Sequence, residues 1–456
     1  MKNIVLIGIS GSGKTVIGRQ LAETLQREFI DLDSLISERE GLAIAEIFEK
    51  GGEEGFRQAE TRAINALAER GSAVIACGGG AVLKEENMSM LSQKGIVVFL
   101  NRSVENILGK VNLKDRPLLS RQPWRLHEIY RERLPLYEKY ADFRVSLEHR
   151  EEVLKKLLHI TALQQKGKRL AVIGDPVDHS LSPQIHRAAL SPLIKELSYE
   201  KVRLERSGLA GWMAGPAGTE YDGFNVTMPH KEAIIPFLHR VEEEADMMGA
   251  VNTVVNRGGE LHGFSTDGGG FAAALRSIGR SFKGKEVAIM GSGGAAAAIA
   301  MKAAREGASK IHIVARKREK RMAILHKIEA AYGGGRGIGH EGLDSIPAKA
   351  AGNPWDSQII INATPLGMKG NGEDFTDFGF LDQVGRDAVI CDIVYDPEKT
   401  RLMKEAENRN IKTLGGIHML IEQALISDCL YLEAEIGREK AFNRVAAGLQ
   451  WRFKEI

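Results

Sequence analysis

A glycine-rich turn near the start of the chain restricts the possible folds more than any other feature of this sequence. Residues 8–15 contain Gly8, Gly11, Gly13, Lys14 and Thr15, and they follow an apolar run at residues 4–7. A helix-like stretch comes directly after them. Glycines in this context let successive backbone N–H groups converge on phosphate oxygens at the N-terminus of a helix. The pattern therefore predicts a phosphate-binding loop between a strand and a helix.

The other residues of this loop predict that it binds a nucleotide with Mg²⁺. A lysine at position 14 can reach the β- and γ-phosphates, and the hydroxyl of Thr15 can ligate Mg²⁺. The alternative is a glycine-rich turn that merely starts a helix, but the strand, the lysine and the threonine in this order favour the phosphate site. We expect the nucleotide to contact Gly8, Gly11, Ser12, Gly13, Lys14 and Thr15.

The hydrophobic pattern indicates an α/β chain with several folding units. A length of 456 residues corresponds to roughly three domains of about 150 residues each. Short apolar runs at residues 4–7, 73–76 and 96–100 alternate with helix-like stretches at 16–28 and 53–69, which is typical of a parallel sheet with helices. A polar segment at residues 164–168 then precedes a new strand at 170–173, and this segment is the expected linker.

The region after the linker is expected to have two lobes. A second βα series runs to about residue 267, and a third begins with the strand at residues 286–290, which opens into Gly291, Gly293 and Gly294 as in a Rossmann unit. Further strands are expected at 311–315, 359–362 and 388–393, and helices at 417–453. We therefore expect a P-loop, nucleoside-monophosphate-kinase-like domain at 1–163, a linker at 164–168, a substrate lobe at 169–268, a Rossmann lobe at 269–414, and C-terminal helices at 415–456 that return to the substrate lobe.

Composition excludes several classes of function. The formal net charge is +2, with 43% hydrophobic and 27% charged residues, so we expect no nucleic-acid or membrane partner. The N-terminal apolar run is too short for a signal peptide, which predicts a cytoplasmic protein. Three widely spaced cysteines, Cys77, Cys391 and Cys429, predict reduced thiols without a structural disulfide or zinc site.

The first 160 residues resemble shikimate kinases. Five motifs carry the resemblance and occur in the family's order: Asp31 with Asp33, Phe56 with Arg57, residues 78–80, residues 116–119, and residues 133–137. The resemblance implies ATP-dependent phosphorylation of shikimate, with Asp33 as the base that binds the acceptor. Because Asp31 and Asp33 are two apart on what we expect to be an extended segment, their side chains should point the same way, with Asp31 organising Mg²⁺.

The remaining kinase motifs imply a site for an anionic acceptor. Arg57 and Arg133 should grip a carboxylate, because a guanidinium matches a carboxylate bidentately; the alternative is a pair of solvated surface arginines. Gly78, Gly79 and Gly80 should allow substrate to approach the backbone, unless they form an ordinary turn. By resemblance, residues 110–116 are a lid that brings Arg116 onto the transferring phosphate and excludes water. Lys110 stands near a position where the family often has an arginine against the adenine.

The chain from residue 169 to the end resembles shikimate dehydrogenases. The motifs again occur in order: residues 180–183, 225–231, 249–253, 265–267, 362–364 and 415–423. The resemblance implies that NADPH reduces 3-dehydroshikimate to shikimate, with Lys231 and Asp267 as the catalytic pair. A ketone reduction needs a proton donor for the developing alkoxide, and a lysine beside a carboxylate can be tuned for that task.

The surroundings of the pair follow from the same segments. We expect a helix to begin at Pro229, so that Lys231 lies near its positive end, which favours the neutral amine, while Asp267 favours the charged form. The alternatives are a solvated helix lysine and a simple N-cap aspartate. The serines of residues 180–183 should bind the substrate carboxylate, unless they only begin a turn. The full set implied as substrate contacts is Ser180, Ser182, Asn225, Thr227, Lys231, Asn252, Asp267, Tyr395 and Gln423.

The glycine turn of the Rossmann lobe predicts the cofactor. Gly291, Gly293, Gly294 and Ala295 follow a strand and open an alanine-rich helix, which strengthens an otherwise weak motif. The next strand ends in a basic run with Arg316, Lys317 and Lys320, where an NAD enzyme usually presents an acidic residue to the ribose. These basic residues favour NADPH. The family commonly has Asn-Arg-Thr here and an arginine in the glycine turn, so Arg316 is the matching position and the two lysines are compensating candidates.

Together the two halves predict consecutive steps on small molecules, 3-dehydroshikimate and shikimate, by a monomer or a homodimer. Three rivals stay open: another small-molecule kinase in the first half, an NAD-type quinate/shikimate dehydrogenase in the second, or a non-catalytic shikimate-binding sensor there. The basic run disfavours NAD, and the retention of both Lys231 and Asp267 disfavours a sensor.

Overall fold

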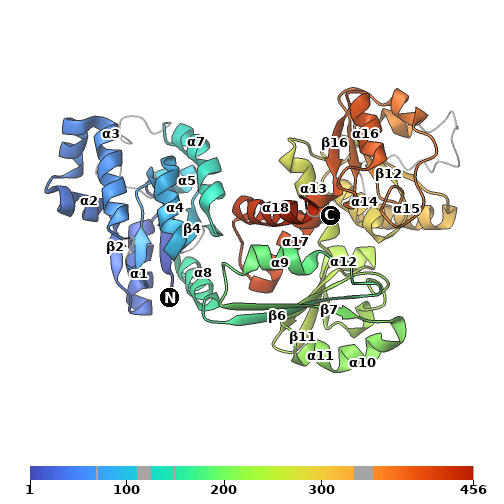
Figure 1. Ribbon diagram of the computed structural model, residues 1–456, viewed down its shortest axis with the longest axis horizontal. Helices are drawn as coiled ribbons and strands as arrows, with labels where there is room; N and C mark the ends of the chain where they lie inside the picture. Colours follow the sequence, from blue (N-terminus) through green and yellow to red (C-terminus); the bar gives the residue numbers. More distant parts are fainter. Residues whose placement is uncertain (68–69, 110–124, 147–149, 333–352, 455–456) are drawn as a thin grey trace. The chain divides into compact units, whose positions relative to one another are not determined.

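The chain folds into two compact units, both of which are discontinuous in sequence. The computed structural model describes residues 1–67, 70–109, 125–146, 150–332 and 353–454 (Figure 1). The first unit contains Met1–Lys168, Arg187–Leu197 and Asp428–Ile456, and the second contains Arg169–His186 and Ser198–Ser427. Residues 428–456, which we expected with the substrate lobe, thus fall in the first unit.

The first unit is built on a five-stranded sheet in which the described pairings are all parallel, with strand order β2-β3-β1-β4-β5. The strands are β1 (Asn3–Ile7), β2 (Phe29–Asp31), β3 (Val74–Ala76), β4 (Gly95–Asn101) and β5 (Phe143–Ser146). Strands buried on both faces need continuous apolar runs, and every residue of β1 is buried. The strands expected at residues 4–7, 73–76 and 96–100 are confirmed as β1, β3 and β4.

Helices pack against this sheet. They are α1 (Lys14–Leu25), α2 (Leu32–Glu40), α3 (Ile44–Asn65), α4 (Glu85–Lys94), α5 (Val104–Leu108), α7 (Arg125–Tyr140) and α8 (Arg150–Leu163), with the 3₁₀ turn η1 (Ala81–Leu83). Phe99 on β4 stacks on Tyr137 of α7 with ring centroids 5.0 Å apart, and both are fully buried. Burial of side chains of this size stabilises by about 1.5–3 kcal/mol each, which ties α7 to the sheet.

The second unit contains a six-stranded mixed sheet with the order β7-β6-β8-β10-β11-β9. Its strands are β6 (Gly167–Gly174), β7 (Glu196–Arg203), β8 (Gly223–Val226), β9 (Arg240–Val241), β10 (Thr253–Arg257) and β11 (Glu260–Phe264). Because β6 begins at Gly167, it takes in the last two residues of the expected linker. The helices are α9 (Ser182–Leu190), α10 (Leu209–Ala214), α11 (Pro216–Thr219) and α12 (Glu243–Met248), with 3₁₀ turns η3 (Arg206–Gly208) and η4 (Ile235–Phe237).

This sheet is not the simple βα series that we expected for residues 169–267. Strand β10 pairs antiparallel with both β8 and β11. A two-residue hairpin at Gly258 and Gly259 joins β10 to β11, and its φ angles of 65° and 99° are those that a tight antiparallel turn requires. The adjacent glycines were a hairpin signal that the expected series overlooked.

A second, parallel sheet of the same unit has the order β13-β12-β14-β15-β16. The strands are β12 (Glu286–Met290), β13 (Lys310–Val314), β14 (Ile359–Asn362), β15 (Val389–Asp392) and β16 (Lys412–Gly415). The helices are α13 (Asp267–Ser277), α14 (Gly294–Arg305), α15 (Arg318–Tyr332), α16 (Arg401–Asn408) and α17 (Gly416–Leu432), with η5 (Pro354–Asp356) and η6 (Gly379–Gln383). The last helix, α18 (Arg438–Lys454), belongs to the first unit. Alternating strands and helices confirm the Rossmann lobe.

Two local expectations were wrong. No helix begins at Pro229; the chain forms turns and then η4. Pro236 lies in η4 and lacks the amide donor that a continuing helix would need there. Asp33 does not lie on an extended segment either, because Asp31 is the N-cap of α2 and accepts from the amides of Asp33 and Ser34 at 3.1 and 3.3 Å. Capping starts the helix one residue before Asp33.

Within the described residues, no helix combines the length and the apolar character that a membrane crossing requires.

Candidate active sites

The predicted phosphate loop lies between β1 and α1, as the sequence indicated. Gly8, Gly11 and Gly13 have φ angles of 147°, 90° and 94°, which residues with side chains rarely adopt. A Cβ on Gly8 would lie 2.6 Å from the carbonyl oxygen of Leu100, so the loop is held against β4. Gly13 is the N-cap of α1 and has no side chain to occupy the first amides of the helix. Those N–H groups form an anion-binding end.

Two side chains of the loop are buried and point to phosphate binding. The Lys14 ammonium donates to the carbonyl oxygens of Gly8 and Ile9 at 2.8 and 3.0 Å. The Ser12 hydroxyl is fully buried and has no hydrogen-bond partner among the described residues. Buried hydroxyls normally have partners. A loop of glycines, a lysine and an unsatisfied hydroxyl fits the triphosphate of ATP.

The expected metal ligands lie side by side at the edge of this loop. The Thr15 hydroxyl donates to the Asp31 carboxylate at 2.8 Å. Oxygen ligands are what Mg²⁺ prefers, and Mg²⁺ usually needs few protein ligands because it keeps water and phosphate in its shell. One hydroxyl and one carboxylate beside the phosphate loop therefore fit the ion. No group of three or more His, Cys, Asp or Glu side chains that could hold a metal occurs in the part of the chain that the structure describes.

The acceptor residues predicted for the first half gather around three glycines. A Cβ on Gly78 would lie 2.9 Å from an Asp33 carboxylate oxygen, and one on Gly80 would lie 2.2 Å from a nitrogen of the Arg57 guanidinium. The carbonyl oxygen of Gly79 accepts from Arg133 at 3.1 Å. Residues from α2, α3 and α7 thus meet at one backbone segment, because glycine leaves room for them. A carboxylate and two guanidinium groups at one place fit an acceptor with both a hydroxyl and a carboxylate.

Two supporting residues of this site escaped sequence reasoning. Glu60 is fully buried, and its carboxylate accepts from Arg57 at 2.8 Å. Burial raises the pKa of Glu60, while the hydrogen bond and the charge of Arg57 lower it. The Tyr137 hydroxyl donates to Gly79 at 2.6 Å, and burial raises the pKa of this tyrosine to about 12. Glu60 stands three residues after Arg57 on α3, and that helical spacing was the available signal.

The lid predicted at residues 110–116, with Lys110 and Arg116, lies outside the described residues. Its role stays a prediction.

The second site contains the predicted catalytic pair. The Lys231 ammonium donates to a carboxylate oxygen of Asp267 at 2.5 Å. Asp267 is the first residue of α13, and Lys231 lies in the turn after β8. The neighbouring His230 is fully buried and its ring contacts the carbonyl oxygen of Leu204 at 2.6 Å. The backbone carbonyl of Lys231 also accepts from the amide of Val251 at 2.8 Å. These hydrogen bonds fix the turn that carries Lys231, in place of the helix that was expected there.

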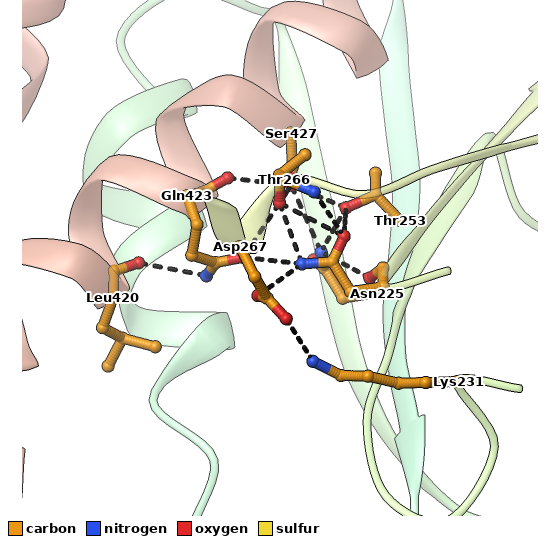
Figure 2. A network of polar contacts seen from close by, with 9 residues as sticks. Asn225, Lys231, Thr253, Thr266, Asp267, Leu420, Gln423 and Ser427 are labelled. Atoms are coloured by element: carbon orange, nitrogen blue, oxygen red, sulfur yellow. Dashed lines mark hydrogen bonds and ion pairs between the residues drawn. The ribbon is translucent and has the colours of Figure 1, made fainter. Parts of the chain in front are cut away.

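Asn252 fixes the other side of the pair. Its amide nitrogen donates to the second Asp267 oxygen at 2.7 Å and to the hydroxyl of Thr266 at 2.9 Å, while its amide oxygen accepts from the Thr266 backbone at 2.8 Å. Gln423 on α17 closes the ring, because its side-chain oxygen accepts from Asn252 and Thr266 at 3.4 and 3.2 Å. Figure 2 shows Asp267 between this network and Lys231. One oxygen of the Asp267 carboxylate therefore accepts from Asn252, and the other accepts from Lys231.

Behind this layer, Asn225 and Ser427 form a second one that sequence reasoning assigned only in part (Figure 2). Asn225, predicted as a substrate contact, accepts from the Tyr199 hydroxyl at 2.6 Å and donates to Thr253 and Ser427 at 3.2 and 3.4 Å. The fully buried Ser427 donates to the Gln423 backbone at 3.0 Å. Ser427 follows Gln423 by one helical turn, a spacing that could have identified it.

The structure joins some predicted substrate residues to this network and leaves others apart. Asn225, Lys231, Asn252, Asp267 and Gln423 belong to it. The hydroxyls of Ser180 and Ser182 bond to each other at 3.1 Å. Among the described residues, no hydrogen bond links these serines, Thr227 or Tyr395 to the network. Burial raises the pKa of the Tyr395 phenol.

The predicted dinucleotide turn follows β12. Gly291 has a φ of 125°, and a Cβ there would lie 2.6 Å from the carbonyl oxygen of Ala363. Cβ atoms on Gly293 or Gly294 would meet no atom within 4 Å. Gly293 is the N-cap of α14, and Ala295 lies in the first turn of that helix, which contains no acidic residue. A strand, an open glycine turn and an uncapped helix end fit a pyrophosphate.

The basic run lies at the end of the strand next to the one that carries the glycine turn. Arg316, Lys317 and Lys320 are exposed at the end of β13 and the start of α15. Strand β13 pairs with β12, whose end carries the glycine turn. Exposed cations at the end of the neighbouring strand fit a ribose 2′-phosphate.

A buried carboxyl supports the strand ends beside this turn. Asp392, at the end of β15, accepts from Asn362, the backbone of Val394 and Thr400 at 3.0, 3.0 and 2.7 Å. Burial raises its pKa to about 6, although these hydrogen bonds lower it. Asn362 in turn accepts from the Thr364 hydroxyl at 2.6 Å. The 362–364 motif is thus anchored to β15.

Comparison with known proteins gives different relatives for the two halves. Residues 10–162 match the shikimate kinase family, and residues 172–254 match the shikimate dehydrogenase substrate-binding domain. The NADP⁺ shikimate dehydrogenase of Desulforamulus reducens is 33% identical over 298 residues, which cover 62% of this chain and 97% of that protein.

Solved structures agree with the sequence relatives. A shikimate dehydrogenase in complex with NADP⁺ is 33% identical with a TM-score of 0.54, covering 62% of this chain and 96% of that one. A quinate dehydrogenase from Corynebacterium glutamicum in complex with NAD is 26% identical with a TM-score of 0.55, and the match covers 62% of this chain and 100% of that one.

Proposed function

Because the chain belongs to the shikimate dehydrogenase family and carries a shikimate kinase domain ahead of it, we propose that one polypeptide performs two consecutive reactions. It reduces 3-dehydroshikimate to shikimate with NADPH, and it phosphorylates shikimate with ATP and Mg²⁺ to shikimate 3-phosphate. We place the kinase site on residues 1–163 and the reductase site on residues 169–456. The 2.5 Å contact between Lys231 and Asp267 is the observation that carries the reductase assignment, since a sensor needs no proton donor.

In the reductase half, the side chains supply and position a proton. Reduction adds a hydride to the carbonyl carbon and a proton to the carbonyl oxygen, and NADPH supplies the hydride when bound. The Lys231 ammonium donates the proton as negative charge develops on the oxygen. The Asp267 carboxylate holds the ammonium in place, and Asn252 prevents the carboxylate from turning away, because it occupies the second oxygen at 2.7 Å.

The basic run makes the reductase an NADPH enzyme. Arg316 should pair with the 2′-phosphate, with Lys317 and Lys320 adding positive charge. Arg316→Asp should therefore raise the KM for NADPH much more than the KM for NADH, because it places a carboxylate where the phosphate binds. Steady-state kinetics with both cofactors test this. An intact preference for NADPH would show that Arg316 does not determine the specificity. Substitution of Lys317 and Lys320 by aspartate would then be the next test.

In the kinase half, the side chains orient two substrates. MgATP supplies the phosphoryl group when bound, with Lys14 on its phosphates and Thr15 and Asp31 toward the ion. Arg57 and Arg133 hold the shikimate carboxylate, so that Asp33 faces the hydroxyl and accepts its proton. Three charged groups around Gly78, Gly79 and Gly80 carry this assignment.

Two lysine substitutions separate the activities in one assay. Lys14→Ala should abolish ADP formation and leave NADPH oxidation unchanged, so that product stops at shikimate. Lys50→Ala, an exposed lysine of α3, is the matched control and should retain both rates. Loss of NADPH oxidation in Lys14→Ala alone would contradict the assignment of separate sites.

Location and assembly complete the proposal. We propose a cytoplasmic protein that acts as a monomer or a homodimer on small molecules. Analytical ultracentrifugation of the full chain distinguishes the two assemblies.

A further inference from the structure

The edge of the first sheet is paired with the C-terminal part of the chain. Strand β5 is the edge strand, next to β4. The Arg144 amide donates to the carbonyl oxygen of Glu435 at 2.9 Å, and the Gly437 amide donates to that of Asp142 at 2.8 Å. Phe143 and Ile436 form an antiparallel bridge between these bonds. Edge strands expose unpaired amides and carbonyls that invite pairing, so residues 435–437 complete this edge.

The pairing depends on one glycine. A Cβ on Gly437 would lie 1.8 Å from the carbonyl oxygen of Ala141 and 2.5 Å from its carbon. No side chain fits at such a distance from backbone. The contact therefore requires glycine for space, since Gly437 does not have a positive φ.

A buried charge continues the contact into α18. Asp142 is only 4% exposed, and one of its carboxylate oxygens accepts from the Val97 amide of β4 at 2.9 Å. The other oxygen pairs with Lys440 at 2.9 Å and with Arg444, both on α18. Burial lowers the pKa of Lys440, and the charge of Asp142 raises it. A buried carboxylate without its cations would be costly, so α18 neutralises a charge inside the first unit.

The same helix contacts the element that carries acceptor residues of the kinase site. Helix α18 packs against α7, which provides Arg133 and Tyr137, and both of these donate to the carbonyl oxygen of Gly79. Asp142 lies in the short segment between the end of α7 at Tyr140 and β5, so its ion pairs connect this segment to α18.

We propose that residues 435–444 are a structural part of the kinase: they cover its sheet edge, neutralise Asp142 and hold α7 in the position that Arg133 needs. The kinase then extends beyond residues 1–163, and the end of the dehydrogenase sequence completes it. Only the activity readout of this proposal rests on the proposed kinase function.

The first test compares two glycines of the full-length chain. Gly437→Ala should displace the segment, whereas Gly448→Ala is the matched control, because a Cβ at Gly448 on α18 meets no atom within 4 Å. In Gly437→Ala, the peptide with the Arg144 amide should exchange hydrogen about tenfold faster, and the kinase KM for shikimate should rise. NADPH oxidation should stay within about twofold of wild type. Unchanged exchange at Arg144 in Gly437→Ala would overturn the proposal.

The second test uses charge and does not depend on the glycine. The double variant Lys440→Ala, Arg444→Ala leaves Asp142 buried without its cations. The equilibrium constant for folding of the first unit should therefore fall about tenfold or more. Adding Asp142→Asn should recover part of that loss, because an amide keeps an acceptor for Val97 without the charge. A double variant as stable as wild type, or no recovery with Asp142→Asn, would contradict the role of this charge. A wild-type chain without kinase activity would refute the proposed function instead, and the exchange and stability results would still decide this proposal.

Discussion

The two active sites hold their functional groups in different ways. In the reductase site, side chains bond to side chains: Lys231 contacts Asp267, and Asp267 contacts Asn252. In the kinase site, bonds to side chains also occur, from Arg57 to Glu60 and from Thr15 to Asp31. Two of its cations contact backbone instead: Arg133 donates to the carbonyl oxygen of Gly79, and Lys14 donates to that of Gly8.

The difference follows from the two reactions. A proton donor acts on a single oxygen atom of the substrate, so its position must be fixed. The side chains that bond to it must therefore be fixed by hydrogen bonds of their own. Phosphoryl transfer joins two large anions, so the site needs room and close approach to amides, which glycines provide. The reductase should therefore be sensitive to loss of a side chain, and the kinase should be sensitive also to addition of one beside a glycine.

The largest effect on the reductase should come from its lysine–aspartate pair. Lys231→Ala removes the proposed proton donor and should lower kcat for ketone reduction by about a hundredfold or more, while the Kd for NADPH stays near the wild-type value. Lys404→Ala, an exposed lysine of α16, is the control. Rapid-mixing kinetics and cofactor fluorescence measure the two quantities. A variant that reduces as fast as wild type would show that the pair is misassigned.

A buried carboxyl should make the reductase half sensitive to pH. The pKa of Asp392 is raised to about 6 from 3.8, so between these values the native state binds its proton more tightly than the unfolded state does. Stability should then fall as pH rises through this window, by up to about 3 kcal/mol, and no further above it.

Asp392→Asn removes this titration. Urea unfolding of both proteins between about pH 4 and pH 7 gives the difference in free energy of unfolding at each pH. The wild type should lose stability relative to the variant as pH rises toward 6. A difference that does not change with pH, or that grows in favour of wild type, would contradict the effect of burial on Asp392.

The kinase should respond to a single methyl group. Gly80→Ala places a Cβ 2.2 Å from the Arg57 guanidinium, so that the arginine has to move and the contact proposed between Arg57 and the shikimate carboxylate is lost. The KM for shikimate should rise about tenfold or more, with the KM for ATP unchanged. Gly55→Ala on α3, where a Cβ meets no atom within 4 Å, should behave as wild type. Equal KM values for both alanine variants would show that Arg57 does not bind the acceptor.

The smallest effect should come from the second layer of the reductase. Ser427→Ala leaves Asn225 and Thr253 without one partner each, a loss of about 1 kcal/mol, which corresponds to about a fivefold lower kcat with little change in KM. Ser277→Ala on α13, whose hydroxyl bonds to the carbonyl oxygen of Ala274, is the control. A raised KM with normal kcat would indicate that Ser427 serves binding instead.

Sequence reasoning found the features that are local in the chain. The phosphate loop at Gly8 and the turn at Gly291 depend on a strand, a few glycines and a helix, all within one stretch, and both have the expected form. The Lys231 and Asp267 pair is distant in sequence, and the family motifs identified it.

The errors arose where two local rules competed or where contact is long-range. Pro229 suggested a helix start, but the chain forms turns and then η4, which contains Pro236. Alternation suggested an extended Asp31 to Asp33 segment, but capping by Asp31 started α2. The contact of Gly437 with Ala141 joins residues far apart in the chain, and nothing in either segment alone indicates it.

The central claim is that one chain performs both steps, and a mass balance tests it most directly. Purified full-length protein is given 3-dehydroshikimate, NADPH and MgATP, and NADP⁺, ADP and shikimate 3-phosphate are measured in the same sample. We predict that the three products appear in equal amounts at completion. Oxidation of NADPH with no ADP and no shikimate 3-phosphate, or ADP formation only when shikimate is added and no oxidation of NADPH, would contradict the account.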